Sequence, residues 1–325
     1  MMKVAYKTEA GWVEKTESGI LKVLAYFSVF QYPLTKDEIQ RFLPPAVKTT
    51  SLESELAYLV SERVVFKIDE FYLLLDDVQL VKRRREGNMR AEQLLPKAIK
   101  IGKFLSKFPY VTGIGVSGSL SKNYAHEKAD IDFFIITSAN RLWIARTFMH
   151  VFKKLTFLTG QQHYYCMNYY LDEQSLRLRD QNFYTAIEIS TLVPVEGKGL
   201  QDFFVANAWV SEWFASYSPG QILRQKAGRK PIFKKLMEWL FNNKAGDKLD
   251  NYLMRMTSRR WRKKEEQRKV NYEGKEMALV TGKHYAWSNP DSFQDKIITL
   301  YNKKMAELKF KWPRHFEPVS FSFGE

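Results

Sequence analysis

Asp130 and Asp132 stand two positions apart at the start of an apolar run that ends at Ile136. In a strand, residues two apart point to the same face. At about 3.3 Å per residue, their Cα atoms then lie roughly 6.6 Å apart. Their carboxylates can converge on one hard cation, and magnesium that binds phosphates commonly takes one or two carboxylates with phosphate oxygens and water. The spacing therefore predicts a catalytic metal site with Asp130 and Asp132 as ligands.

A Gly-Ser pair, Gly118 and Ser119, ends an earlier apolar run and precedes an expected short helix or loop. Gly118 has no Cβ, so the backbone there can approach a ligand closely. Ser119 offers a hydroxyl and a backbone N–H at a helix start, which suits an anion. We predict that Gly118, Ser119 and Lys122 hold phosphates of a nucleotide. Arg141 follows the acidic strand and is a further phosphate-binding candidate, although a surface charge on a helix explains it equally well.

Residues 117–119 read Ser-Gly-Ser, ten residues follow, and residues 130–132 read Asp-Ile-Asp in an apolar strand. This pattern resembles the polymerase-β-like nucleotidyltransferase superfamily, in which a Gly-Gly or Gly-Ser pair and a spacer of similar length precede Asp-x-Asp or Asp-x-Glu. The resemblance implies an α+β fold with a mixed β-sheet flanked by helices. It also implies Mg²⁺ as cofactor, with Mn²⁺ as an alternative, and a nucleoside triphosphate as substrate.

The resemblance is incomplete at one position. Many members of the superfamily carry a third carboxylate on the following strand, which is expected here at 163–171. Asn168 occupies the matching place, and Asp172 shares its face at the strand end. An asparagine can ligate a metal through its carbonyl but cannot act as a base. Asp172 or Glu188 substitutes, or the chemistry proceeds without a third acid, or activity is lost; the sequence leaves these open. The predicted catalytic residues are Asp130, Asp132, Asn168 and Asp172.

The composition indicates a folded protein with an anionic partner. The 325 residues are 45% hydrophobic and 15% aromatic, and the formal net charge is +15. This length suggests two or three domains, and the positive charge favours nucleotides or nucleic acid as partners. The one cysteine, Cys166, cannot form a disulfide within the chain, which fits a cytoplasmic location. No apolar run reaches about 18 residues, so we expect no transmembrane segment.

Residues 17–75 read as three helices followed by a hairpin. The second helix is expected at 36–43, with Thr35 as cap and Glu38 three residues later, the pattern of a capping box. This order resembles a winged helix-turn-helix, and we expect such a module at the front of bacterial proteins that carry a nucleotidyltransferase domain. The third helix, at 51–62, is acidic, whereas a DNA-reading helix presents Arg, Lys, Asn or Gln. DNA binding and protein contact are therefore equally good interpretations of this module.

The remaining chain is expected to be largely helical. We predict helices over 78–107, 140–158 and 182–217, with the strand at 163–171 between them. The last third is basic and mainly helical, with arginines and lysines around Trp261. It either binds RNA, DNA or an anionic membrane surface through counterion release or is a charged, solvated helix face. The predicted domains are a winged-helix-like domain at 1–80, a nucleotidyltransferase domain at 81–217 and a basic helical region at 218–325.

Two functions of different kinds fit these patterns. The first is a metal-dependent nucleotidyltransferase that moves a nucleoside monophosphate from an NTP to a hydroxyl on a small molecule, a protein or an RNA. The second is a nucleotide-sensing, DNA-binding regulator with a weak or silent catalytic site, which the winged-helix-like front and Asn168 both favour. The sequence identifies neither the acceptor nor the NTP, and turnover distinguishes the two functions.

Overall fold

The computed structural model describes residues 12–13, 15–45, 47, 52–219, 231–267, 277–290, 293–316 and 319–320. Two compact units make up the chain. The first contains residues 1–84, 211–217 and 295–325, and the second contains residues 85–210 and 218–294. The predicted limits at 80 and 217 differ from this division. The basic last third is divided between them, with residues 218–294 in the second unit and 295–325 in the first.

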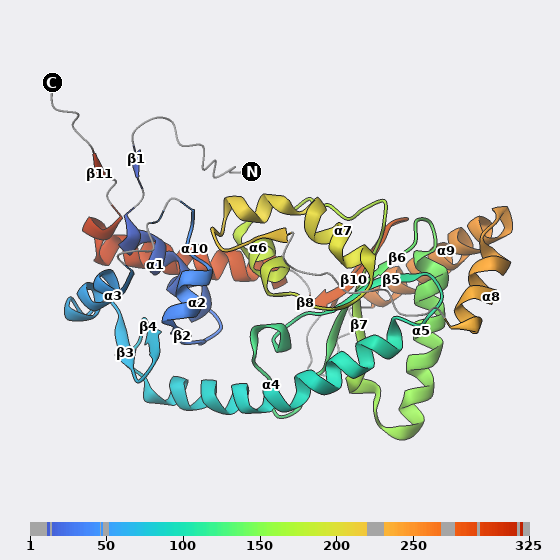
Figure 1. The fold of residues 1–325 in the computed structure, drawn as a ribbon, viewed down its shortest axis with the longest axis horizontal. Helices are drawn as coiled ribbons and strands as arrows, with labels where there is room; N and C mark the ends of the chain where they lie inside the picture. The colour runs from blue at the N-terminus through green and yellow to red at the C-terminus, as the bar shows by residue number, and fades with distance from the viewer. Residues whose placement is uncertain are drawn as a thin grey trace. The chain divides into compact units, whose positions relative to one another are not determined.

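The first unit contains short helices and a small antiparallel sheet (Figure 1). Thr35 and Glu38 form the predicted capping box at the start of the second helix. The predicted helices and hairpin are confirmed, and a two-residue strand before the second helix completes the sheet. The winged-helix resemblance stays a prediction. The elements are α1 (Thr16–Ser28), α2 (Lys36–Arg41), α3 (Leu52–Ser61) and a sheet of order β2 (Leu34–Thr35), β4 (Phe71–Leu73), β3 (Phe66–Ile68).

The C-terminal segment returns to this first unit. Met305 and Leu308 of helix α10 (Phe293–Lys311) pack in one buried cluster with Ala25 of α1. Two short strands, β1 (Trp12–Val13) and β11 (Val319–Ser320), pair antiparallel. The chain ends therefore build one structure, although they are far apart in sequence.

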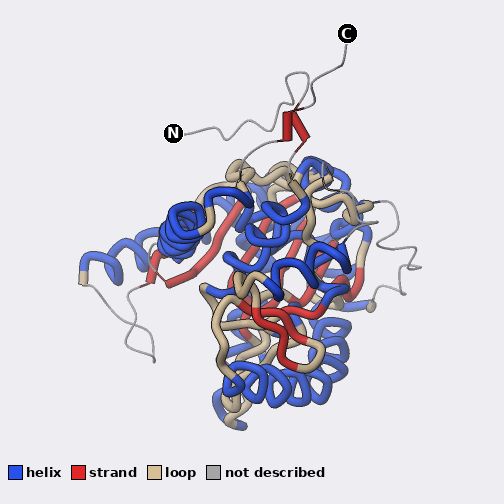
Figure 2. Tube along the Cα trace, turned by 90° about the vertical axis from the view of Figure 1, so that its left-hand side faces the viewer, coloured by secondary structure: helices blue, strands red, loops and turns tan. Residues whose placement is uncertain are grey.

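The second unit is organised around a six-stranded mixed sheet. β6 and β7 run parallel, and the helix α5 (Leu142–Thr156) connects them, as a parallel pair requires. The other neighbouring pairs are antiparallel. Helices surround these strands, which are red in Figure 2. The strand order is β8 (Val193–Glu196), β5 (Val111–Val116), β6 (Asp132–Thr137), β7 (Cys166–Asp172), β10 (Tyr285–Pro290), β9 (Met277–Thr281).

Helices cover both faces of this sheet, which confirms the predicted α+β fold. On one face, Phe133 and Ile135 of β6 belong to a buried cluster with residues of α5 and of α4 (Val78–Leu105). On the other face, the ring of Phe134 packs on Phe203 of α7 (Lys198–Ala206), with centroids 4.7 Å apart. Because side chains alternate along a strand, Asp132 shares the face of Phe134.

The sheet is larger than the sequence indicated. Residues 193–196 form β8 inside a segment predicted as helical, and β9 with β10 forms a hairpin inside the last third. Helices α8 (Ile232–Phe241) and α9 (Lys244–Glu266) lie in the last third, which was predicted to be mainly helical. Among the described residues, no helix combines the length and the apolar character that crossing a bilayer requires.

Candidate functional site

The two acids lie where β6 begins. Asp132 is the first residue of the strand, and Asp130 precedes it by two. Backbone bonds fix this segment on both sides: the carbonyl of Asp132 accepts from Ser117 N at 2.9 Å, and the carbonyl of Ile131 accepts from Cys166 N at 3.1 Å. The acids therefore stand on a backbone held between β5 and β7, a rigid base for a binding site.

The Gly118 turn packs directly against Asp132. Gly118 has φ +69°, in the left-handed region that favours glycine. A Cβ at this position would come within 2.4 Å of Asp132 Oδ2. The Gly118 carbonyl accepts from Ser121 Oγ at 2.8 Å and from Lys122 Nζ at 3.2 Å. Only glycine therefore satisfies both the backbone conformation and the close approach of the carboxylate.

The segment after the turn is short, as the expected short helix or loop allows. Leu120–Lys122 form one turn of 3₁₀ helix, and the exposed Ser119 precedes it. The backbone carbonyl of Ser119 accepts from Lys122 N at 3.0 Å and from Tyr124 N at 3.1 Å. An anion bound by Ser119 would therefore contact a compact turn, and this turn lacks the aligned peptide dipoles that a longer helix supplies.

Asn168 meets Asp132 across the parallel strands. The pairing of β6 with β7 shifts between Phe133 and Phe134, which leaves Asn168 as an extra residue in a bulge. Its Nδ2 donates to Asp132 Oδ1 at 2.9 Å, and its Oδ1 accepts from Cys166 Sγ at 3.2 Å. The predicted neighbour of the acid pair is thus an amide that donates to Asp132.

Glu188 supplies a further carboxylate close to Asp132. It lies on α6 (Phe183–Thr191), whose first turn is capped by Asn182 accepting from Thr185 N at 2.9 Å. Its carboxylate forms an ion pair with Lys122 at 2.9 Å, and its negative charge contributes to raising the pKa of Asp132. Of the two acids that the sequence suggested as a third carboxylate, Asp172 and Glu188, it is Glu188 whose charge acts on Asp132.

The acids at this site repel one another. Burial first, and then the charges of Asp130 and Glu188, raise the pKa of Asp132 to about 7, while hydrogen bonds from Cys166 and Asn168 oppose the rise. Burial also raises the pKa of the Cys166 thiol to about 12, so this cysteine is a poor nucleophile. Negative charge gathered in a desolvated place favours a cation, because a cation offsets both the repulsion and the lost hydration.

Asp172 lies at the opposite end of β7, which corrects its predicted catalytic role. The register pairs Cys166 with Asp132 but Asp172 with Thr137. Five residues of strand therefore separate the levels of the two acids, about 16 Å. Asp172 is fully buried and accepts from Asn140 N at 2.8 Å, Gln174 N at 2.9 Å and His284 Nδ1 at 2.8 Å. Its carboxylate holds loops and strands together.

Arg141 also lies away from the acid pair, against its predicted phosphate contact. It follows the far end of β6 and is 6% exposed. Its guanidinium donates to Asp247 Oδ1 at 2.6 Å and to the backbone carbonyl of Asn243 at 3.4 Å. Arg141 therefore ties the start of α5 to the start of α9.

The gathered residues fall in a segment with a known family. Residues 96–196 match the family model described as a nucleotidyltransferase domain. These 101 of the 325 residues are therefore similar to nucleotidyltransferase domains. This confirms the predicted resemblance for these residues, which include the Gly118 turn, the acid pair, Asn168 and Glu188. Comparisons with curated proteins and with solved structures found no match.

The nucleotidyltransferase domain has the donors that magnesium uses. In the described part of the chain, no group of three or more histidines, cysteines and acids is placed to hold a metal ion. Two carboxylates are nevertheless sufficient on the protein side, since Mg²⁺ bound to a nucleotide completes its shell with phosphate oxygens and water. Asp130 and Asp132 are hard oxygen donors, and burial together with the charge of Asp130 raises the pKa of Asp132, so a bound cation would favour its ionised form. These residues fit such an ion.

Proposed function

We propose that this protein transfers a nucleoside monophosphate from an NTP to an acceptor hydroxyl at the start of β6. One observation carries the proposal: Gly118, in a conformation that favours glycine, lies so close to Asp132 that a Cβ would reach within 2.4 Å of its Oδ2. This close approach supports a single site made of the proposed phosphate-binding turn and the proposed metal ligands. The match of residues 96–196 supports the same chemistry.

In this proposal, Asp130 and Asp132 hold Mg²⁺, which neutralises charge on the phosphates when it is bound. Gly118 and Ser119 contact the phosphates through the exposed turn. The Lys122 ammonium, whose side chain is 17% exposed, adds positive charge beside that turn while paired with Glu188. Asn168 donates to Asp132 and so fixes the orientation of its carboxylate.

The transfer forms one bond and breaks one bond. The acceptor oxygen attacks the α-phosphorus, the bond from that phosphorus to the bridging oxygen breaks, and pyrophosphate leaves. The hydroxyl proton passes to a carboxylate or to water, because the Asn168 amide cannot take it. Glu188 is the carboxylate that we assign to this role, since it acts on Asp132 and its side chain is 30% exposed. Most of the rate increase then comes from positioning and charge neutralisation.

Transfer of label tests the proposal. The protein is incubated with ATP or CTP labelled at the α-phosphate, with Mg²⁺ or Mn²⁺, and with cell lysate as a source of acceptors. We expect a labelled product and free pyrophosphate, both lost in Asp130→Asn and Asp132→Asn. Nucleotide binding with no transfer under any of these conditions contradicts the proposal and favours the nucleotide-sensing regulator.

A further inference from the structure

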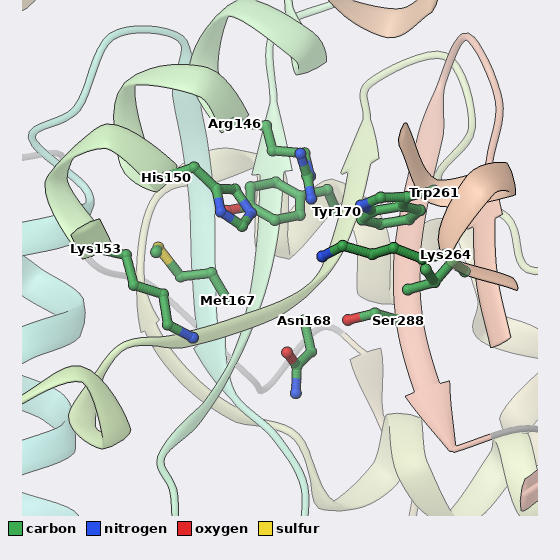
Figure 3. Close-up of a pocket in the computed structure, with 10 residues that line it drawn as sticks. Arg146, His150, Lys153, Met167, Asn168, Tyr170, Trp261, Lys264 and Ser288 are labelled. Carbon is green, nitrogen blue, oxygen red and sulfur yellow. The ribbon is translucent and has the colours of Figure 1, made fainter. Parts of the chain in front are cut away.

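A cavity of about 210 Å³ lies in the second unit, next to the proposed site. Helices α5 and α9 form two of its walls, and strands β7, β9 and β10 form the others (Figure 3). Asn168, which donates to Asp132, is part of the lining. The described lining residues are Arg146, His150, Lys153, Met167, Asn168, Tyr170, Trp261, Lys264, Leu279 and Ser288.

The charges that line this cavity have one sign. Arg146, Lys153 and Lys264 are cations, and no carboxylate occurs among the described lining residues. Figure 3 shows the ends of Arg146 and Lys264 directed toward each other, with the Lys153 side chain on the opposite wall. Burial, followed by the charges of Arg146 and Lys153, lowers the pKa of His150 to about 3, so its ring is neutral and adds no charge. The cavity is therefore electrically suited to an anion.

Arg146 has no partner of opposite charge in the described part of the chain. It is 7% exposed, and its guanidinium lies 4.6 Å from the ring centre of Trp261 and 5.9 Å from that of Tyr170. It forms no hydrogen bond or ion pair with another described residue, and its Nε is buried without a partner. A buried charge without a counter-charge is costly. An anion in the cavity would remove that cost.

The size of the cavity limits the ligand. Sites for drug-sized molecules commonly occupy about 300–1,000 Å³, so a cavity of about 210 Å³ suits a single phosphate group better than a whole nucleotide. Hydrogen-bond donors surround the space, including the guanidinium of Arg146 and the ammonium groups of Lys153 and Lys264. Such charge-assisted donors are typical of phosphate recognition.

The position of the cavity favours an acceptor, and not the triphosphate, as its occupant. Trp261, Lys264, Leu279 and Ser288 lie outside the matched segment 96–196, so α9 and the β9–β10 hairpin add these walls to the nucleotidyltransferase domain. The proposed triphosphate contacts are on the Gly118 turn, between β5 and β6. An occupant of the cavity would instead touch Asn168, one side chain away from Asp132.

We propose that this cavity binds the phosphate group of a small phosphorylated acceptor whose free hydroxyl receives the nucleotidyl group. The inference rests on the proposed function for the identity of the ligand as an acceptor. The bound phosphate is not itself transferred: the acceptor hydroxyl attacks the α-phosphorus of the NTP and pyrophosphate leaves, as above. Phosphate binding in the cavity positions that hydroxyl.

Inorganic phosphate is the first probe, because it needs neither metal nor NTP. Calorimetric titration of the full chain in metal-free buffer should show saturable binding that Lys153→Gln and Lys264→Gln each weaken about tenfold. Lys154→Gln and Lys263→Gln are matched controls, since each is adjacent to its test residue on the same helix and is not among the lining residues. No saturable binding, or equal losses in the controls, overturns the proposal.

A transfer assay then identifies the acceptor. With Mg²⁺ and labelled ATP, phosphomonoesters that carry a hydroxyl should accept label better than their dephosphorylated forms, and Lys264→Gln should raise their KM with little change in kcat. The acceptor assignment is overturned by any of three results. Label is transferred equally to the phosphorylated and dephosphorylated forms, inorganic phosphate competes with MgATP, or only nucleic acid accepts label in a way that depends on the cavity. If Asp132→Asn transfers normally, the proposed function fails, and the metal-free phosphate result is unaffected.

Discussion

Acidic side chains lie at both ends of the β6–β7 strand pair, but their partners differ. The near end is the start of β6, at Asp132, and the far end is the end of β7, at Asp172. At the far end, Asp172 accepts from two backbone N–H groups and from His284. At the near end, Asp132 accepts from Asn168 while Asp130 and Glu188 repel it. At the far end the Asp172 carboxylate is used in structural hydrogen bonds, whereas at the near end Asp132 has two acids close enough to raise its pKa. An acid whose carboxylate neighbours other acids is the better candidate for binding a metal.

A raised pKa by itself does not separate the two ends. Asp250 lies at the far end and accepts from Trp143 N and Ile144 N, both at 2.9 Å. Burial nevertheless raises its pKa to about 6. What distinguishes Asp132 is the combination of neighbouring acids, a glycine turn in contact with its carboxylate, and partial exposure. The comparison therefore rests on geometry and partners, and it can be tested at both ends.

The largest expected effect belongs to the far end. Asp172→Ala should lower the free energy of unfolding by about 3 kcal/mol, because it leaves buried backbone N–H groups of Asn140 and Gln174 without acceptors. The affinity for MgATP should stay at the wild-type value. Chemical denaturation and calorimetry measure the two quantities. Lost MgATP affinity with unchanged stability would place Asp172 in the site after all.

The Gly118 turn provides the next test. Gly118→Ala adds a Cβ against Asp132, whereas Gly160→Ala adds one at the same kind of backbone angle, φ +67°, with nothing within 4 Å. Both variants should lose about 1–2 kcal/mol of stability from backbone strain. Gly118→Ala alone should weaken MgATP binding, at least about tenfold, an energy of about 1.4 kcal/mol. Equal binding by the two variants would separate the turn from the acid site.

The Asn168→Asp variant tests whether the near end gains activity from a third carboxylate. It replaces the amide that donates to Asp132 with a carboxylate, which adds a ligand for Mg²⁺ and a group that can accept a proton. We expect Mg²⁺-dependent transfer to rise about tenfold, equivalent to about 1.4 kcal/mol in the barrier. Glu188→Gln is the companion variant. If it abolishes a transfer activity that Asn168→Asp does not improve, Glu188 is the third acid and Asn168 only positions Asp132.

The smallest effect is a pH dependence at the far end. The pKa of Asp250 is raised from 3.8 to about 6 in the folded protein, so the folded state binds this proton more tightly than the unfolded state. Its contribution to stability is full below the unfolded pKa and decreases as pH rises through the folded pKa. From pH 4 to 6, wild type should lose at least about 1 kcal/mol relative to Asp250→Asn. Parallel stability curves for the two proteins would contradict this assignment.

The sequence predicted the near end better than the far end. Gly118, Asp130 and Asp132 are close in the chain, so alternation in a strand and the need for a glycine were enough to associate them. Asn168 was also identified, because one strand follows the other through a single helix. Asp172 and Arg141 were misassigned, since their partners His284 and Asp247 lie about a hundred residues away. Local patterns do not report such pairings.

The cavity and the hairpin were missed for related reasons. β9 and β10 flank Gly282 as two short apolar runs, a hairpin signal that the surrounding basic helices obscured. Arg146, His150 and Lys153 recur at intervals of four and three, which places them on one face of α5. That spacing was visible in the sequence. The charges across from them, on α9, become neighbours only when the fold brings α9 against α5.

Calorimetric titration of ATP in the presence and absence of Mg²⁺ tests the central claim most directly. Wild type should bind ATP tightly only with Mg²⁺, and Asp132→Asn and Asp130→Asn should lose that metal-dependent gain. Both variants should remain folded, because each replaces a side chain at the strand start by one of nearly equal shape. Metal-dependent ATP binding that is unchanged in both variants would contradict the assignment of the start of β6 as a metal-nucleotide site.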